Sequence, residues 1–258
     1  MKKLMALLLA AVMVLSLTAA VAENASDAAA IQEKGVLVVG ITDFAPMDYK
    51  DDNGNWVGID AELATMFAES LGVDVEFIEI DWDNKILELN AGTVDCIWNG
   101  MTLTDEVLSS MECTDAYMSN AQVIVAPTEV LDTLPEELDS DDAALTGMTF
   151  AVEAGSAGEA VATDLGWNVT PVSSQANALM EVAAGTSDAA VIDELMAMAM
   201  VGEGTSYANL DYDYELNTES YGVGFRTGSD LADMATNFLA ACYEDGTTEA
   251  LIVKYLGE

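Results

Sequence analysis

Polar residues follow two apolar runs of this sequence, at places where a folded chain could hold a small polar solute. Residues 99–102, Asn-Gly-Met-Thr, come directly after an apolar run over residues 94–98. Asp193 comes directly after a second apolar run over residues 189–192. In open α/β sheets, ligands bind beyond the carboxyl ends of the strands. If both runs are strands, their carboxyl ends present an amide, a hydroxyl and a carboxylate to a ligand.

Several other kinds of chemistry are excluded by residue type. The chain has no His, which removes Ser-His-Asp triads, histidine general bases and the usual zinc sites. The three cysteines, Cys96, Cys113 and Cys242, show no Cys-x-x-Cys spacing that would indicate a metal or redox pair. Cys96 lies in an apolar strand and Cys242 on the apolar stripe of a helix, so we expect buried free thiols. One disulfide is the alternative, with partners that the sequence does not choose. No metal or cofactor is expected.

The first 22 residues have the pattern of an export signal. Two lysines precede an uncharged run over residues 4–22, and that run ends in Ala20-Val21-Ala22, an A-x-A cleavage site. An uncleaved membrane anchor is the alternative, since a run of this length could just span a bilayer. No Cys lies near the cleavage point, so no lipid anchor is expected. The protein is therefore predicted to be secreted across the inner membrane and soluble in the periplasm or another extracytoplasmic space.

The charge of the chain disfavours polyanionic partners. It has 46 acidic and 7 basic residues, and loss of Lys2 and Lys3 with the signal leaves 5 basic residues against 46 acidic ones, a net charge of -41. Such a surface repels phosphate backbones and anionic lipid headgroups, so neither nucleic acid nor a membrane surface is an expected partner. It favours cationic solutes. Hydrophobic residues make up 52% of the chain, which is enough to build a core.

Two series of alternating strands and helices are predicted from the apolar patterns. The first comprises a strand over 36–41, a helix from Asp60 to Gly72, a strand over 75–80, a helix over 85–90 and a strand over 94–98. The second comprises a strand over 148–152, a helix near 157–165, a strand over 169–172, a helix over 175–184 and a strand over 189–192. Short connections between such elements imply parallel sheets with right-handed crossovers. Asp60 is expected to cap its helix, and Asn53-Gly54 indicates a hairpin turn.

A repeated signature indicates two similar α/β lobes. Residues 91–98, AGTVDCIW, match residues 184–191, AGTSDAAV, and each segment ends a predicted helix and opens a buried strand. A final strand over 220–225 and the amphipathic helix after it are expected to return to the first lobe, which gives two chain crossings and a hinge. The predicted division is a signal peptide at 1–22, first lobe at 23–118, second lobe at 119–218, and the C-terminal return to the first lobe at 219–258.

Eight motifs, in this order and spacing, carry a resemblance to a known family. They are Phe44-Ala45-Pro46-Met47, Asn55-Trp56-Val57-Gly58-Ile59-Asp60, Ile80-Asp81-Trp82-Asp83, Gly92-Thr93-Val94-Asp95, Gly100-Met101-Thr102-Leu103-Thr104, Gly155-Ser156, Ser187-Asp188-Ala189-Ala190-Val191-Ile192-Asp193 and Tyr221-Gly222-Val223-Gly224-Phe225-Arg226. From residue 35 to 257 the chain resembles the family 3 extracellular solute-binding proteins, the receptors of polar amino-acid ABC importers. The resemblance implies a type II periplasmic-binding-protein fold with two Rossmann-like lobes, which close on a ligand by hinge bending.

The resemblance also implies a binding role for ten residues. They are Phe44 as a ring stacked on the ligand, Trp82 as an apolar lining residue, Asn99, Gly100, Met101 and Thr102 as a hydrogen-bonding segment, Gly155, Ser156 and Ala157 as a helix N-terminal turn for a carboxylate, and Asp193 as the carboxylate for an amine. Each has a plainer alternative. Phe44 and Trp82 could be core aromatics, Thr102 and Ser156 ordinary caps, and Asp193 a helix-starting acid. Trp98 could reach the cleft or pack in the core.

One departure from the family bears on the ligand. The family's Thr-x-x-Arg, whose Arg binds the ligand carboxylate, here reads Thr104-Asp105-Glu106-Val107. Loss of a bidentate charged pair costs roughly 1.5 to 3 kcal/mol, about tenfold to a few hundredfold in affinity. We therefore expect an amine, a cationic amino acid, or an amino-acid derivative whose acid group is masked or is bound only by the turn at Ser156. Lys85 could replace the missing cation, although a solvated helix lysine is the plainer interpretation.

The resemblance implies delivery of the solute to an ABC permease by a monomeric, non-enzymatic receptor. A ligand-sensing accessory protein is an alternative. A dehydratase on the same fold is a further alternative, but it would need cationic groups for a dicarboxylate substrate, and the cleft segments are nearly free of cations.

Overall fold

The computed structural model of the chain describes residues 26–135, 138, 145 and 147–257. The predicted signal peptide, residues 1–22, lies outside this part of the chain. No helix within the described residues is long and apolar enough to cross a membrane.

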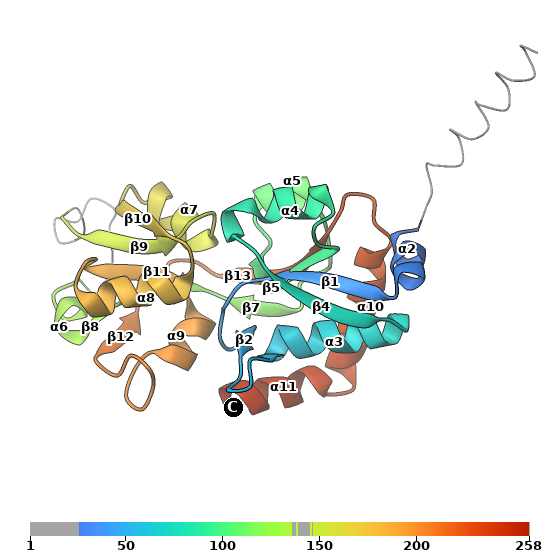
Figure 1. Ribbon diagram of the computed structural model, residues 1–258. Helices are drawn as coiled ribbons and strands as arrows, with labels where there is room; N and C mark the ends of the chain where they lie inside the picture. Colours follow the sequence, from blue (N-terminus) through green and yellow to red (C-terminus); the bar gives the residue numbers. More distant parts are fainter. Residues whose placement is uncertain (1–25, 136–137, 139–144, 146, 258) are drawn as a thin grey trace, which may run out of the picture.

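Two β-sheets form two lobes that lie side by side (Figure 1). The first sheet has the strand order β4-β1-β5-β13-β6, with β7 also paired to β13. Its strands are β1 (Val36–Ile41), β4 (Asp74–Glu79), β5 (Cys96–Thr102), β6 (Glu112–Cys113), β7 (Met118–Asn120) and β13 (Glu219–Phe225). The helices of this lobe are α2 (Asp27–Lys34), α3 (Ile59–Leu71), the 3-10 helix η2 (Trp82–Asn84), α4 (Lys85–Ala91), α5 (Asp105–Ser110), α10 (Leu231–Glu244) and α11 (Thr247–Leu256).

The second lobe is built on a sheet with the order β10-β9-β11-β8-β12. Its strands are β8 (Gln122–Pro127), β9 (Thr149–Glu153), β10 (Asn168–Val172), β11 (Ala189–Asp193) and β12 (Leu210–Asp213). Its helices are α6 (Thr128–Leu131), α7 (Ala157–Asp164), α8 (Gln175–Ala184) and α9 (Glu194–Met200). The predicted α/β class with two lobes is confirmed.

Both sheets are mixed, so the prediction of parallel sheets was incomplete. Strands β1, β4 and β5 are parallel, as are β9, β10 and β11. However, β13 runs antiparallel to β5, and β8 runs antiparallel to β11. The strand-helix-strand units give the parallel pairs. The antiparallel strands β8 and β13 are entered directly from the other lobe without a crossover helix, which the alternating pattern of either series could not show.

The chain passes between the sheets twice. It leaves the first sheet after Asn120 and enters the second at Gln122, and it returns between Asp213 and Glu219. The end of β7 pairs with the start of β13, with Asn120 opposite Glu219. The two crossings therefore lie side by side (Figure 1).

The repeated signature has the predicted structure in both lobes. Gly92 ends α4 and Gly185 ends α8, each in the left-handed conformation, with φ of 76° and 72°. Glycine adopts this conformation without a Cβ penalty, which stops each helix ahead of a buried strand. The hairpin prediction is also confirmed, because β2 (Tyr49–Lys50) and β3 (Trp56–Val57) pair antiparallel around the Asn53-Gly54 turn.

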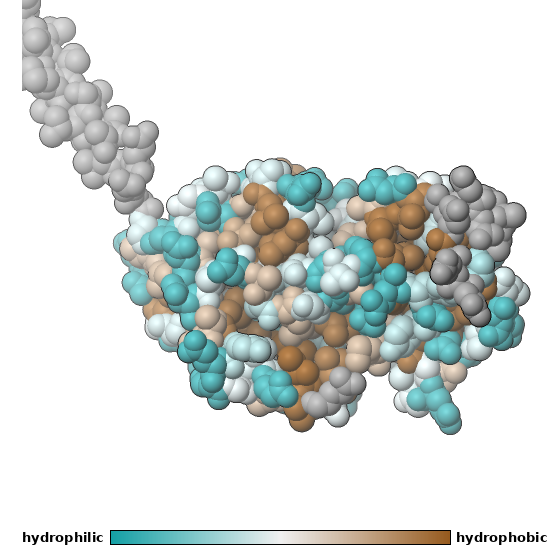
Figure 2. All heavy atoms as spheres, turned by 180° about the vertical axis from the view of Figure 1, so that it is seen from behind, coloured by the Kyte–Doolittle hydropathy of each residue, from teal (hydrophilic) through white to brown (hydrophobic). Residues whose placement is uncertain are grey.

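The described residues form three clusters of buried hydrophobic side chains, and the largest has members in both lobes. In the first lobe Phe67 of α3 packs its ring 5.9 Å from Trp98, which is fully buried. In the second lobe Phe150 and Trp167 stack with ring centroids 4.4 Å apart. Large exposed hydrophobic side chains are spread over α4, α5, α8, α10 and α11, and Figure 2 shows apolar and polar residues mixed over the rear face. The core interpretation of Trp98 is confirmed.

Asp60 has a different place from the one predicted. It is the second residue of α3, which begins after Gly58, and its side chain is fully buried. Its carboxylate accepts hydrogen bonds from Gly100 N at 2.6 Å and from the Tyr117 hydroxyl at 2.7 Å. Burial raises its pKa to about 7. The cap prediction for Asp60 was wrong because an acidic residue near the start of a helix has the same sequence pattern whether its side chain caps the helix or is buried in the core.

The three cysteines are free, so the disulfide alternative is wrong. Cys96 and Cys242 are buried and Cys113 is partly buried. Burial raises the pKa of the Cys113 thiol to about 11, which leaves little thiolate to react near neutral pH.

Candidate functional site

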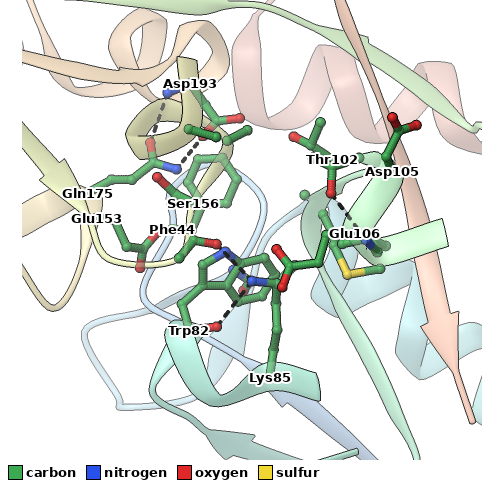
Figure 3. A pocket seen from close by; sticks show the side chains of 18 residues that line it. Phe44, Trp82, Lys85, Thr102, Asp105, Glu106, Glu153, Ser156, Gln175 and Asp193 are labelled. Atoms are coloured by element: carbon green, nitrogen blue, oxygen red, sulfur yellow. Dashed lines mark hydrogen bonds between the residues drawn. The ribbon is translucent and has the colours of Figure 1, made fainter. Parts of the chain in front are cut away.

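A cavity of about 220 Å³ lies between the two lobes (Figure 3). It is lined by all ten residues to which the sequence assigned a binding role: Phe44, Trp82, Asn99, Gly100, Met101, Thr102, Gly155, Ser156, Ala157 and Asp193. Its wall also includes Lys85, Thr104, Asp105, Glu106, Val107, Glu153, Ala160 and Gln175. The first lobe contributes the ends of β1 and β5 with η2, α4 and α5. The second lobe contributes the ends of β9 and β11 with α7 and α8.

The wall from the first lobe carries the aromatic side chains. Phe44 and Trp82 line the cavity and are also largely buried, so each contributes to the core and to the pocket. The Phe44 ring meets Tyr221 edge-on, with ring centroids 6.5 Å apart. Gly100 has a φ of 54°, and a Cβ at this position would lie 2.4 Å from the Phe44 ring. Glycine therefore allows Phe44 to lie against the end of β5.

Two polar side chains of the 99–102 segment bind the protein itself. Asn99 accepts a hydrogen bond from Thr42 N at 2.8 Å and donates one to the Thr42 hydroxyl at 2.7 Å. Thr102 donates its hydroxyl hydrogen to Glu219 at 2.9 Å. These contacts hold the second half of β5, which extends to Thr102 and not only to residue 98 as predicted.

The turn before α7 already holds a carboxylate of its own. Ser156 caps the helix by accepting a hydrogen bond from Glu159 N at 3.1 Å. Glu159 in turn accepts one at 2.7 Å from the N–H of Gly155, the residue before the cap. The Gly155 N–H is thus occupied by Glu159, and one donor of the turn that the resemblance assigns to a ligand carboxylate is already paired.

Asp193 ends β11 and is held by both lobes. Its carboxylate accepts hydrogen bonds from Asn120 Nδ2 and the Tyr221 hydroxyl, both at 2.5 Å, and from Gln175 Nε2. Its side chain is only 4% exposed. Burial, and then the charge of Glu219, raise its pKa to about 7. A cation placed in the pocket would stabilise the charged form of this carboxylate.

Glu153 and Gln175 were not identified from the sequence. Glu153 is the last residue of β9, and the predicted strand stopped one residue earlier. The strand-end rule that pointed to Asp193 would have indicated Glu153 if this boundary had been placed correctly. Gln175 is the first residue of α8, and no sequence signal marks it apart from its place at a helix start.

Lys85 is buried in the pocket, so the interpretation as a solvated helix lysine is wrong. Its side chain is 6% exposed and lies over Trp82, with Nζ 4.9 Å from the ring centroid. The ammonium donates a hydrogen bond to Gly155 O of the other lobe at 2.8 Å. Burial lowers its pKa. The lysine stem packs on an aromatic ring while its charged end reaches a carbonyl across the cleft.

Lys85→Met is expected to open the unliganded pocket without unfolding the protein. Methionine keeps the apolar contact with Trp82 but cannot donate to Gly155 O. A hydrogen bond contributes about 0.5 to 1.5 kcal/mol, so the equilibrium ratio of closed to open protein should fall by about 2- to 10-fold. Small-angle X-ray scattering should then show a larger radius of gyration. Lys50→Met is the matched control, because Lys50 also lies over a ring, that of Trp56, but within one lobe. Unchanged scattering of Lys85→Met would contradict this role.

Acidic groups outnumber basic ones on the cavity wall. Asp105 and Glu106 lie at the start of α5, and Glu153 and Asp193 lie on the opposite wall (Figure 3). Lys85 is the basic residue among the lining residues. Within the part of the chain that the structure describes, no group of three or more His, Cys, Asp or Glu residues is arranged to hold a metal ion. The electrostatics of the wall favour a cationic ligand.

A closed pocket between two α/β lobes, lined at the carboxyl ends of parallel strands in both, defines the class of solute-binding proteins. Residues 37–258 match the bacterial extracellular solute-binding proteins, family 3, and the chain belongs to this family. The family predicted from the sequence motifs is confirmed.

Similar proteins are known as amino-acid-binding proteins. The arginine-binding extracellular protein ArtP of Bacillus subtilis is 27% identical over 99% of this chain and 98% of its own length. A crystal structure of a mutant of ArgBP from T. maritima has a TM-score of 0.81 and 30% identity, and covers 90% of this chain and 100% of that one. An ancestral amino acid-binding protein, described as a precursor of cyclohexadienyl dehydratase, has a TM-score of 0.80 and 29% identity over 90% of this chain and 100% of that chain.

Proposed function

We propose that this chain captures an amine-bearing solute in the pocket between its lobes and delivers it to an ABC permease. The observation that carries the proposal is the buried Asp193 carboxylate, which opens on a cavity with more acidic than basic groups. An ammonium group placed against Asp193 would supply the counter-charge that the protein does not.

Two features argue against a free α-carboxylate as the main recognition group. Val107 lines the cavity at the place where the resemblance puts Arg, and it is buried with the apolar residues around Trp82. Glu159 occupies the N–H of Gly155. The ligand proposed is therefore an amine, a cationic amino acid, or an amino-acid derivative with a masked acid group.

The proposal includes lobes at 23–118 with 219–258 and at 119–218, which close by bending at the two crossings. The strand membership of the two sheets supports this division, except that β7 carries the first lobe two residues further, to Asn120. The Tyr221 hydroxyl in β13 donates a hydrogen bond to the Asp193 carboxylate in β11, and this bond joins the two sheets. A ligand that binds Asp193 would therefore affect the contact between the lobes. Export by residues 1–22, a soluble extracytoplasmic location without a lipid anchor, and a monomeric state complete the proposal.

Titration calorimetry of the purified mature chain with the twenty amino acids, polyamines and small cationic amines tests this function. Binding of an amine that is lost when Asp193 is changed supports it. Failure of every amine and amino acid to bind would contradict it. A ligand that binds the folded state also raises the melting temperature, which gives an independent measurement.

Val107→Arg is expected to strengthen the binding of zwitterionic amino acids by about tenfold to a few hundredfold. The new guanidinium would extend from α5 into the cavity and form a charged pair with the ligand carboxylate. Calorimetry with the amino acid that binds best measures the change. Val107→Met is the control for side-chain size. Equal affinities of the Arg variant and the parent protein would show that another group already binds the carboxylate.

We further propose that the protein binds its solute without changing it. Asp193 and Glu153 could serve as acids, and one structural relative is described as a precursor of a dehydratase. A dicarboxylate substrate would, however, need several cations, and Lys85 is the basic residue on the cavity wall. Mass spectrometry of a bound amine after prolonged incubation should return the unmodified solute.

A further inference from the structure

Glu153 has a buried carboxyl group that the hydrogen-bond network of the pocket leaves open. Its side chain lines the cavity and is 4% exposed, and Oε1 has no hydrogen-bond partner among the described residues. By contrast, both carboxylate oxygens of Asp193 accept hydrogen bonds from side chains. A buried polar atom without a partner costs free energy. Among the described residues, Gln175 is the side chain placed to donate to this carboxyl group, and Oε1 is left for a donor from a ligand.

The strand register places Glu153 close to Asp193. Strands β9 and β11 are parallel neighbours in which Ala151 pairs with Ala190, so Glu153 lies level with Ile192, the residue before Asp193. Neighbouring strands are about 5 Å apart. Figure 3 shows Glu153 and Gln175 on the same wall as Asp193. The pocket thus presents two separate carboxyl groups at one edge of the second sheet.

Within the described part of the chain, no basic side chain forms an ion pair with Glu153, although the charge of Lys85 lowers its pKa. Among the ion pairs that the described residues form, none includes Glu153 or Lys85. The charged groups that face Glu153 are Asp193 from β11, Asp81 from the loop before η2, and Lys85 from α4. From α8, a hydrogen bond from the Gln175 side chain lowers the pKa of Glu153. Burial, and then the charge of Asp193, raise its pKa to about 8, so the empty pocket holds a proton on this group near neutral pH.

We propose, on the basis of the proposed function, that Glu153 binds a second cationic group of the ligand and that the solute is a short diamine or a diamino compound without a free acid group. One ammonium would be held by Asp193 and the other by Glu153. The cavity of about 220 Å³ suits a short solute. The acidic start of α5 and the hydrogen bond from Gly155 N to Glu159 disfavour a carboxylate in the same space. Asp193 thus binds the ammonium group that every ligand carries, and Glu153 determines the preference for a ligand with a second one.

The test compares diamines with monoamines of the same length by calorimetry. The probes are 1,3-diaminopropane to 1,6-diaminohexane, each against the corresponding alkylamine from propylamine to hexylamine. We expect the best diamine to bind about 10- to 100-fold more tightly than its monoamine. Glu153→Gln and Glu153→Leu should remove this preference, so that each variant binds the diamine and the matching monoamine with affinities within about twofold of each other. Glu129→Gln, an exposed acid of α6, is the control for long-range charge.

The pH dependence provides a second measurement. Binding of an ammonium beside Glu153 expels the proton that this carboxyl holds in the empty pocket, so diamine affinity should rise more steeply than monoamine affinity between pH 6.5 and 8.5. Glu153→Gln should make the two slopes equal. Circular dichroism establishes that both variants are folded.

The outcomes separate the two proposals. If diamines bind no more tightly than monoamines, or if their preference survives both substitutions, the role of Glu153 is overturned while the amine receptor stands. If no amine and no amino acid binds, the proposed function itself fails.

Discussion

Asp193→Asn is expected to reduce the affinity for amines by about 30-fold to a few thousandfold. Removing the charge from one partner of a buried, hydrogen-bonded charge pair costs roughly 2 to 5 kcal/mol, because the ligand ammonium is then desolvated without a counter-charge. Asp193 is 4% exposed, so water cannot replace the lost interaction. Calorimetry with the best amine found in the screen measures the effect.

The design of this experiment must separate binding from folding. An Asn side chain cannot accept at both positions that now face Asn120 and Gln175, so a modest fall in melting temperature is expected in the unliganded variant. Asp211→Asn is the matched control, because Asp211 is an exposed acid of the same lobe and its substitution should leave affinity unchanged. An Asp193→Asn protein that is folded and binds amines as well as the parent would contradict the assigned role.

The unliganded protein is expected to lose stability as the pH rises from 5 to 8, the reverse of the usual behaviour of carboxylates. Burial raises the pKa of Asp60 and of Asp193 to about 7 and that of Glu153 to about 8, whereas the same groups titrate near 4 in the unfolded chain. Between about pH 4 and 8 the folded state therefore holds more protons than the unfolded state. Stability falls with pH wherever the native state binds more protons.

The size of this effect should be large enough to measure by thermal denaturation. Each such carboxyl contributes up to about 1.4 kcal/mol per pH unit within its window. We expect at least about 2 kcal/mol less stability at pH 8 than at pH 5, and a melting temperature lower by about 5 °C. The chain has no His, so no ordinary side chain titrates in this range and could obscure the trend.

Two comparisons assign the trend to the buried carboxyls. Asp60→Asn should flatten the curve, while Glu33→Gln, which changes an exposed acid, should not. A saturating amine should also flatten it, because the ligand charge stabilises the ionised forms of Asp193 and Glu153. A stability that rises from pH 5 to pH 8 in the unliganded protein would refute the protonated state of these groups.

Much of the fold could be predicted from local patterns. The apolar runs and the glycines after helices identified most strands and helices within two residues, and the repeat at 91–98 and 184–191 indicated two related lobes. The strand-end rule and the family motifs together indicated ten residues that prove to line one cavity. These features are local in the chain, since they depend on the spacing of side chains along single elements.

Other features depend on contacts between distant segments. The antiparallel strands β8 and β13, the burial of Asp60 and the free thiols were misjudged or left open because neither strand direction nor the depth of a side chain is written in local spacing. Glu153 was not identified because the predicted strand ended at residue 152, one residue before the end of β9. The ends of helices and strands are the least certain part of a sequence-based assignment.

Local patterns along the chain were sufficient to predict the two-lobed α/β architecture, the excess of negative charge, the absence of histidine chemistry and ten of the residues that line the site. The contacts among these residues are visible in the folded chain alone. Lys85 has the pattern of a surface lysine, yet it reaches Gly155 across 70 positions of sequence. Asp193 and Glu153 acquire their raised pKa values from burial between two lobes. Desolvation and charge coupling depend on distance in space, and the closure of two separate lobes sets those distances.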